Sequence, residues 1–305
     1  MEGITFSFFW EVGLLTWLQS IANPVIIEAA NCFAFFGEEI FIITSLGFLY
    51  WCWDKKKGKF IIVNNYASFI CLAFAKNLFT RRRPYFDHEE IKCLRAPVPG
   101  EDPFNTKIQG FSFPSGHAVN TFSLFGSIAI AFRKKWLYVV CALIVLCVGI
   151  ARMFLGVHYP TDILFGWLIG LVVLVLSSLL QYWLKSPVKA AIVILVLAIP
   201  GWFFCRSNDF YQAFGIMAGV ALSFWFEAKF VKFENPHKLL PIASRLVVGL
   251  IVYFSLNALF KMVLPATLLG TEFMMPYILT SLRLFIMTFA VFGLYPLLFR
   301  FKPFK

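Results

Sequence analysis

Residues 161–184 read TDILFGWLIGLVVLVLSSLLQYWL, and after Asp162 no charged residue follows until Lys185. An α-helix rises about 1.5 Å per residue, so about 20 apolar residues are enough to cross the hydrocarbon core of a bilayer. The run is continuous, whereas a strand of a membrane β-barrel alternates apolar and polar residues over about ten positions. This stretch therefore predicts a transmembrane α-helix.

Apolar runs of this kind recur along the chain. Of its 305 residues, 60% are hydrophobic and only 14% are charged, whereas a soluble domain has about 25% charged residues. We therefore predict an all-α polytopic membrane protein with about nine transmembrane helices. The predicted spans are residues 38–53, 60–80, 118–132, 136–154, 161–184, 190–205, 210–230, 246–264 and 275–298.

The first 37 residues have a different pattern. They are apolar but interrupted by polar and charged residues, among them Glu11, Pro24 and Glu28. This pattern favours interfacial amphipathic helices over residues 1–37, with a full span as the alternative. The start of the chain lacks a basic segment, so we expect no cleavable signal peptide.

Lysine and arginine gather in short clusters after alternate spans. The positive-inside rule places such clusters in the cytoplasm, which predicts a cytoplasmic C-terminus. The net charge of +11 also raises nucleic-acid binding, but short basic clusters between apolar runs are better explained by membrane orientation. No nucleic-acid partner is therefore expected. The clusters lie within residues 55–59, 133–135, 185–189, 229–245 and 300–305.

The seven cysteines are odd in number, and most fall inside apolar runs. This placement indicates small packing residues rather than a disulfide framework. Cys93 and Cys205 fall on the same predicted side of the membrane, so a bridge between these two stays open.

Several basic residues run against the orientation trend. Lys76, Arg81, Arg82, Arg83 and Arg152 lie at span ends on the predicted outer side. Charges at membrane depth are costly, so they usually mark a functional site or have a partner. For Arg81 and Arg82, contact with anionic lipid headgroups explains the placement equally well.

Three segments on this outer side carry residues suited to phosphate chemistry: 76–84, 114–117 and 152–162. The cations Lys76, Arg83 and Arg152 can offset the charge of a phosphate, because arginine binds phosphate oxygens in pairs and lysine adds a point charge. Ser115 and Gly116 open a helix, whose free backbone N–H groups favour an anion. Together these residues predict a phosphate-binding site.

Two of the four histidines stand in the same segments. His158 precedes Asp162 by four residues, so the carboxylate can hold one ring nitrogen and leave the other free to attack. His117 can then protonate the leaving group. Each segment alone has an ordinary explanation, such as a helix cap or an interfacial polar pair. All three in order on one face favour catalysis.

This set of motifs resembles the type 2 phosphatidic acid phosphatase superfamily. The family pattern is Lys, six residues and Arg-Pro; then Pro-Ser-Gly-His; then Ser-Arg, five residues, His, three residues and Asp. The chain matches it over about residues 30–185 and departs from it at Ala151, where the family usually has serine. The matching residues are Lys76, Arg83, Pro84, Pro114, Ser115, Gly116, His117, Arg152, His158 and Asp162.

The resemblance implies a role for each matching residue. It implies that His158 is the nucleophile, His117 the general acid and Asp162 the residue that orients the nucleophile. Phosphate would be held by Lys76, Arg83, Ser115, Gly116 and Arg152. The implied reaction is hydrolysis of a lipid phosphomonoester or pyrophosphate through a phosphohistidine, with no metal and no cofactor, at the extracytoplasmic face of a bacterial plasma membrane.

Under this interpretation residues 38–185 form the catalytic transmembrane core, and residues 186–305 add C-terminal transmembrane helices of unknown role. Phosphatidic acid, phosphatidylglycerol phosphate and undecaprenyl pyrophosphate all fit as the lipid substrate within the bilayer. Transfer of the phosphate to another acceptor, hydrolysis of a soluble ester as in glucose-6-phosphatase, and non-catalytic lipid-phosphate binding or transport stay open as alternatives.

Overall fold

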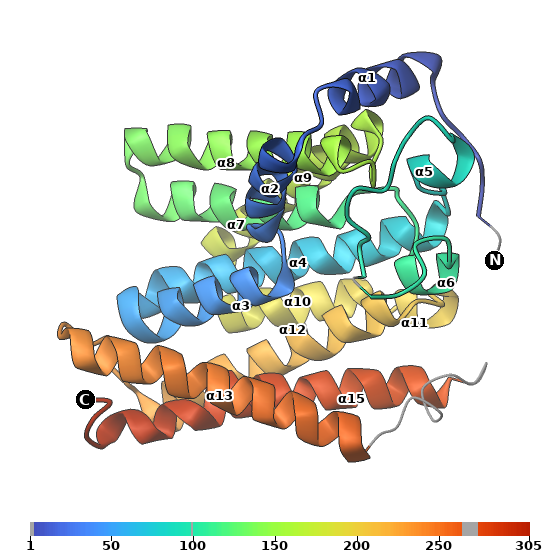
Figure 1. Ribbon diagram of the computed structural model, residues 1–305. Coiled ribbons are helices and arrows are strands. Elements are labelled where there is room, and N and C mark those ends of the chain that lie inside the picture. The colour runs from blue at the N-terminus through green and yellow to red at the C-terminus, as the bar shows by residue number, and fades with distance from the viewer. Residues whose placement is uncertain (1–2, 99, 264–273) are drawn as a thin grey trace. The chain divides into compact units, whose positions relative to one another are not determined.

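The computed structural model describes residues 3–98, 100–263 and 274–305 (Figure 1). Within these ranges the chain is helical, and its only β interaction is an isolated bridge between Ile4 and Arg81. The helices, with η for π- and 3-10 helices, are α1 Phe9–Ser20, α2 Pro24–Phe35, α3 Glu39–Phe48, η1 Leu49–Trp53, α4 Lys55–Leu78, α5 Pro84–Asp87, α6 Thr106–Gln109, α7 Gly116–Phe132, α8 Lys135–Phe154, α9 Pro160–Leu184, α10 Pro187–Ala198, α11 Gly201–Phe204, α12 Asn208–Phe226, η2 Glu227–Val231, α13 Leu239–Val263, α15 Met275–Phe289, η3 Ala290–Leu294 and η4 Tyr295–Arg300.

The all-α membrane fold is confirmed, with fewer full-length spans than predicted. By length and composition, seven helices in the described ranges can cross a membrane, and they coincide with seven of the predicted spans. The predicted spans 38–53 and 118–132 are shorter apolar helices, Glu39–Trp53 and Gly116–Phe132. Polar residues flank both helices and limit their length. Leu264, the predicted end of one span, lies outside the described residues.

The N-terminal region forms two helices, α1 and α2, that meet at an angle of 120°. Asn23 caps α2 by accepting a hydrogen bond from the backbone N–H of Ile26, and Pro24 occupies the first turn, where it has no N–H to leave unpaired. The pair has the composition of one broken span or re-entrant loop, which gives up to eight spans. Its interfacial location stays a prediction, and residues 1–2 lie outside the described residues.

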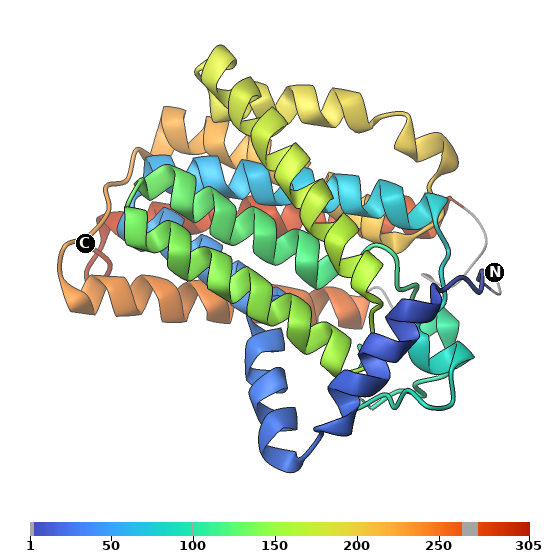
Figure 2. The ribbon, with the colours of Figure 1, turned by 90° about the horizontal axis from the view of Figure 1, so that it is seen from above.

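The chain divides into two compact units, and each is described by itself. The first comprises residues 1–42 and 74–174. In it α7 and α8 lie side by side, and α2 crosses them (Figures 1 and 2). Ala30 and Ala34 of α2 pack against Ala151 and Phe154 of α8. Small side chains at this crossing allow the two helices to approach closely.

The second unit comprises residues 43–73 and 175–305. Here α12 packs against α10 and α15. The carboxylate of Glu227, buried in η2, accepts hydrogen bonds from Lys55 at 2.7 Å and from Lys59 at 2.5 Å, which ties η2 to the start of α4. A buried carboxylate is stable in such a position because two ammonium groups offset its charge.

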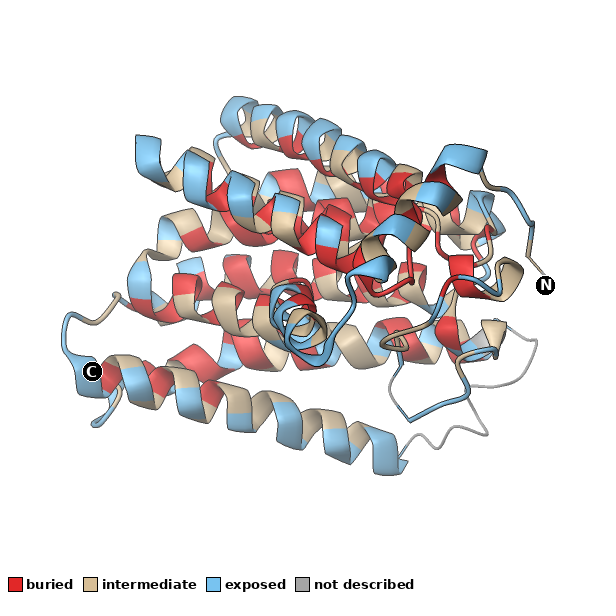
Figure 3. Cartoon of the chain, turned by 45° about the horizontal axis from the view of Figure 1, so that its top comes forward, coloured by how far each residue is buried: buried red, intermediate tan, exposed pale blue. Residues whose placement is uncertain are grey.

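The outer faces of the helices have the character expected of a membrane protein. Exposed residues run along α13, where only Pro241, Arg245 and Gly249 are buried (Figure 3). Large apolar side chains such as Ile251 and Leu259 are exposed there. A helix with this much exposed apolar surface is stable in lipid rather than in water. The chain is therefore an integral membrane protein.

Candidate active site

The second and third predicted motifs meet in the first unit, at the start of α7 and the start of α9. The backbone N–H of Ser115 donates to the carbonyl of Asp162 at 3.0 Å. At Gly166 of α9, a Cβ atom would lie 2.7 Å from the Cβ of Ala118 and 3.0 Å from the carbonyl oxygen of Ser115. Only glycine allows the two helices to approach this closely, so Gly166 keeps the two motifs together.

A tight turn between α8 and α9 presents His158. Gly156 has a φ of +76°, and a Cβ atom there would collide with the carbonyl oxygen of Lys92. Gln19 of α1 donates to the carbonyls of Lys92 at 2.8 Å and Phe154 at 3.1 Å. The turn is thus fixed from both sides, and the side chain of His158 is buried.

The side chains of His158 and Asp162 lie close together, but Nδ1 of His158 has no hydrogen-bond partner among the described residues. Nδ1 of His158 lies 3.5 Å from Oδ2 of Asp162, which also accepts the backbone N–H of Tyr159 at 2.7 Å. With Nδ1 protonated and facing the carboxylate, Nε2 keeps a free lone pair. Burial lowers the pKa of His158 well below its usual value, and the nearby charges of Arg83 and Arg152 lower it further. The ring is therefore neutral at neutral pH.

The three predicted phosphate-binding cations lie around this histidine. The charges of Arg83, Arg152 and Lys76 all act on His158. Arg83 is buried and held by the carbonyls of Gln109, Gly110 and Val157 at 2.8 to 3.2 Å. Arg152 is buried, and its Nε has no hydrogen-bond partner among the described residues. Lys76 lies in the last turn of α4. The site thus concentrates positive charge.

His117 lies in the first turn of α7, close enough to His158 for its charge to act on that ring. Its Nε2 is buried and has no hydrogen-bond partner within the part of the chain that the structure describes. The ring packs on Gly37, where any side chain would collide with it. Ser115 is buried and caps α7 by accepting the N–H of Ala118, and Gly116 is the first residue of the helix. A free imidazole nitrogen therefore faces the cationic site.

Two residues without a predicted role complete the support of Asp162. Nη1 of Arg81 donates to Oδ1 of Asp162 at 2.9 Å, and its Nη2 donates to Glu11 at 2.6 Å. Glu11 in turn accepts the backbone N–H and the hydroxyl of Thr161 at 3.1 and 2.6 Å. The guanidinium of Arg81 also stacks 3.8 Å from the ring centre of Tyr159.

Headgroup contact is therefore the wrong explanation for Arg81, which is only 4% exposed. Its neighbour Arg82 has a side chain that is 34% exposed and pairs with Asp87 at 3.0 Å. The sequence contained one signal for the Glu11–Arg81 pair, a charged residue of each sign within apolar surroundings. It contained no signal that these two residues, 70 positions apart, meet.

Three remaining expectations concern Ala151, the cysteines and a metal. Ala151 is buried in the α2–α8 cluster. All seven cysteines, Cys93 and Cys205 among them, are free thiols in the structure. In residues 3–98, 100–263 and 274–305, no group of three or more His, Cys, Asp or Glu side chains is arranged to hold a metal ion.

Two protein-family models match this chain. The family model described as PAP2 superfamily matches residues 58–186. A second, described as PAP2 superfamily phosphatase, transmembrane extension, matches residues 211–303, the region for which the motifs indicated no family.

Curated relatives match mainly through parts of their length. Lipid A 4'-phosphatase of Bacteroides thetaiotaomicron is 35% identical over 105 residues, 34% of this chain and 44% of that protein. Phosphatidylglycerophosphatase B of Bacillus subtilis is 40% identical over 70 residues, 20% of this chain and 34% of that protein. Bacitracin transport permease protein BcrC of Bacillus licheniformis is 29% identical over 171 residues, 54% of this chain and 72% of that protein. This chain thus spans less than half the length of the first two.

Proposed function

Because the chain belongs to the PAP2 superfamily, we propose that it is a lipid phosphatase that hydrolyses a phosphomonoester or pyrophosphate through a phosphohistidine, without a metal. The observation that carries this proposal is the gathering of Lys76, Arg83 and Arg152 around the buried imidazole of His158, with a second imidazole beside it. Fixed cations in a site of low dielectric stabilise the charge of a phosphoryl group in transit.

In the first step the lone pair on Nε2 of His158 attacks phosphorus. A P–N bond forms while the P–O bond to the leaving group breaks. His117 acts here in its protonated form, which the negative charge of the bound phosphate stabilises among the surrounding cations, and it gives its proton to the leaving oxygen. The positive charge that develops on the His158 ring is stabilised by Asp162, 3.5 Å from Nδ1. The contact has room to shorten as that charge develops.

In the second step water attacks the phosphohistidine. His117, now neutral, takes a proton from the water as the new P–O bond forms. The P–N bond breaks and its electron pair returns to Nε2, which releases inorganic phosphate. The cycle leaves both imidazoles as they began and consumes one water.

We assign Arg81 and Glu11 to positioning rather than to contact with the phosphate. Arg81 holds Oδ1 of Asp162, and the peptide N–H of Tyr159 holds Oδ2, so the carboxylate has little freedom to turn away from His158. Glu11 offsets the remaining charge of Arg81. Groups that orient a catalytic side chain in this way typically change activity 10- to 100-fold when removed.

We propose that the substrate is a lipid phosphate and that the site faces the extracytoplasmic side. The named relatives include phosphatases of lipid A and phosphatidylglycerophosphate, which supports a lipid substrate. The basic clusters on alternate turns support the orientation. We retain residues 38–185 as the catalytic core, and we assign residues 186–305 to the transmembrane extension.

The test is release of phosphate from dioctanoyl phosphatidic acid and a short-chain prenyl pyrophosphate by the purified protein in detergent. We expect turnover that survives a metal chelator and stops with vanadate. His158→Ala should abolish turnover, while Tyr182→Ala, an exposed aromatic residue outside the site, should leave it unchanged. Substrate labelled at phosphorus should leave acid-labile label on the wild-type protein. An active His158→Ala variant overturns the nucleophile assignment, and loss of activity in chelator that magnesium restores overturns the metal-free mechanism.

A further inference from the structure

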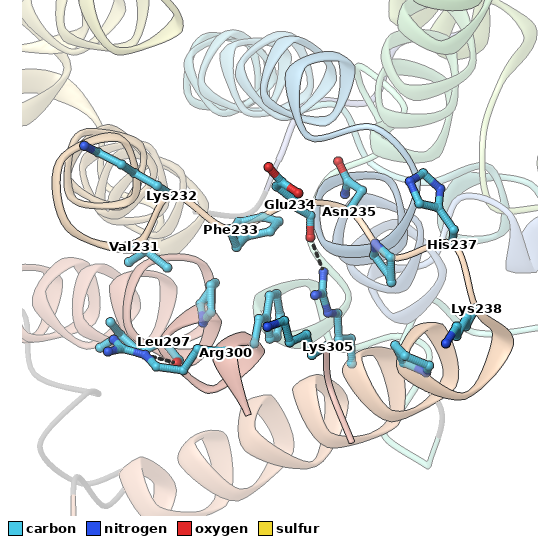
Figure 4. Close-up of a pocket in the computed structure, with 15 residues that line it drawn as sticks. Val231, Lys232, Phe233, Glu234, Asn235, His237, Lys238, Leu297, Arg300 and Lys305 are labelled. Atoms are coloured by element: carbon cyan, nitrogen blue, oxygen red, sulfur yellow. Dashed lines mark hydrogen bonds between the residues drawn. The ribbon is translucent and has the colours of Figure 1, made fainter. Parts of the chain in front are cut away.

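The second unit contains a cavity of about 450 Å³ that none of the proposed catalytic residues line. It is formed by residues 231–238, between η2 and α13, by the first turns of α13, and by η4 (Figure 4). The candidate spans 208–231, 239–263 and 275–300 all begin or end at these residues. The cavity therefore lies at the level of lipid headgroups.

Arg245 forms one wall of the cavity and is only 3% exposed. Its Nε donates to the carbonyl of Phe304, and its Nη1 donates to the carbonyls of Trp51 and Glu234, each at 2.8 Å. The ring of Phe299 lies 4.1 Å from the guanidinium carbon. Among the described residues, no carboxylate forms an ion pair with Arg245 and no partner accepts from its Nη2.

A buried cation without a counter-anion is unfavourable. Arg81 shows the usual solution, since two carboxylates flank it. Arg83 shows the same pattern as Arg245, being buried and bound only to carbonyls, and it belongs to the proposed phosphate site. Arg245 is therefore bound in the same way as an arginine of the proposed phosphate site, and its charge lacks a counter-anion.

The rest of the cavity wall is also basic. Lys232, Lys238, Arg300 and Lys305 line it, and Glu234 is its only acidic side chain (Figure 4). Glu234 forms no ion pair in the part of the chain that the structure describes. Several kinds of cation around one space favour a multivalent anion, and arginine in particular favours the oxygens of a phosphate.

Apolar side chains lie beside these cations. They favour a lipid over a free ion as the ligand of the cavity. Leu239 and Leu240, directly after Lys238, are 81% and 68% exposed. Phe301, directly after Arg300, is 58% exposed. A phosphate held in the cavity would leave its acyl chains next to this apolar surface. Basic pockets between spans at the cytoplasmic side are suited to anionic headgroups for the same reason.

We propose that this cavity, lined by Arg245, Lys238 and Arg300, binds the phosphate of an anionic phospholipid in the leaflet on its own side of the membrane. The site is separate from the proposed phosphatase site and does not depend on that assignment. Bound lipid would add the counter-anion that Arg245 lacks and would fix residues 231–238 against η4. Binding to the folded state then stabilises the protein by mass action.

The test is thermal unfolding of the full chain in detergent, titrated with dioctanoyl phosphatidylglycerol. Dioctanoyl phosphatidylcholine serves as the zwitterionic comparison, and glycerol 3-phosphate as the headgroup phosphate without chains. The variant is Lys238→Gln with Arg300→Gln, both exposed, because replacing buried Arg245 risks misfolding. The matched control is Lys134→Gln with Lys135→Gln, an exposed pair outside the cavity.

We expect phosphatidylglycerol to raise the melting temperature of the wild type and of the control pair. The cavity variant should need at least about tenfold more lipid for the same shift, since it lacks two basic groups that attract an anionic headgroup. An equal response of the cavity variant and the control overturns the site. Equal stabilisation by phosphatidylcholine overturns the requirement for an anion, and equally tight binding of glycerol 3-phosphate overturns the lipid as its source.

Discussion

The guanidinium of Arg81 lies 2.9 Å from the carboxylate of Asp162, and both groups are buried. This contact joins the segment after α4 to the first turn of α9. Through Glu11, at 2.6 Å, it also joins α1 to the same place. The N-terminal helix is therefore part of the support of the candidate active site, and three segments far apart in sequence fix one carboxylate.

Replacing Arg81 should lower kcat far more than replacing its neighbour Arg82. We expect Arg81→Ala to reduce kcat about 100-fold with little change in KM, because Asp162 loses its orientation while the phosphate-binding cations remain. Arg82→Ala, which removes a half-exposed pair with Asp87, should change kcat less than about fivefold. Phosphate release in detergent measures both.

A purely structural role for Arg81 must be separated from positioning, because removing one partner of a buried ion pair costs about 3–5 kcal/mol. Glu11→Gln keeps hydrogen-bonding atoms beside Arg81 and Thr161 while removing one charge. We expect it to fold and to lower kcat about tenfold. If Arg81→Ala and Glu11→Gln fold with wild-type kcat, neither residue positions Asp162.

The acid limit of kcat/KM should lie below pH 6.5. His158 must be neutral to attack, and burial with Arg83 and Arg152 nearby lowers its pKa, so the ring stays neutral at a pH where an ordinary histidine takes up a proton. Arg83→Gln removes one cation and should raise the pKa of His158. Its acid limit should therefore move toward higher pH.

The measurement is kcat/KM between about pH 4.5 and 8, with one substrate for both proteins so that ionisation of the substrate phosphate cancels. Activity in Arg83→Gln will be lower overall because Arg83 is also assigned to phosphate binding. The result is the pH at which kcat/KM falls on the acid side, not the absolute value of kcat/KM. A limb at the same pH in both proteins contradicts the assigned electrostatics.

Ala151→Ser should change turnover by less than about an order of magnitude, roughly one hydrogen bond's worth. Ala151 precedes Arg152 at the position where the family usually has serine, and it is buried against Ala30 and Ala34. The hydroxyl has to fit this packing or turn toward the phosphate. Steady-state rates with dioctanoyl phosphatidic acid measure the change in turnover. A change above 100-fold would show that this position controls catalysis.

Gly156→Ala should destabilise the protein and reduce activity. Its φ of +76° disfavours any side chain by about 1–2 kcal/mol, and the new Cβ atom also collides with the carbonyl of Lys92. Gly100→Ala is the matched control, because Gly100 has a φ of +84° and open space around it. Melting temperatures in detergent should fall more for Gly156→Ala, and equal losses would mean that the crowding at Lys92 has no effect.

The sequence alone was sufficient for features that depend on local composition and spacing. Continuous apolar runs predicted the seven long helices, because about 20 apolar residues in a row are stable as a helix across the hydrocarbon core wherever they occur in the chain. The spacing of His158 and Asp162 across Pro160 predicted their proximity, since Pro160 begins the helix and Asp162 in its first turn lies next to the residues that precede it. The two shorter helices, Glu39–Trp53 and Gly116–Phe132, have nearly the predicted bounds, but they are shorter than the about 20 residues that cross a bilayer.

Only the tertiary structure decided which distant charges meet. The pairing of Glu11 with Arg81, the exposure of Arg82 beside it and the burial of Arg245 without a carboxylate all depend on how helices pack. The physical reason is that burying a charge is favourable only with a partner in place, and no local pattern says which residue, tens of positions away, that partner will be.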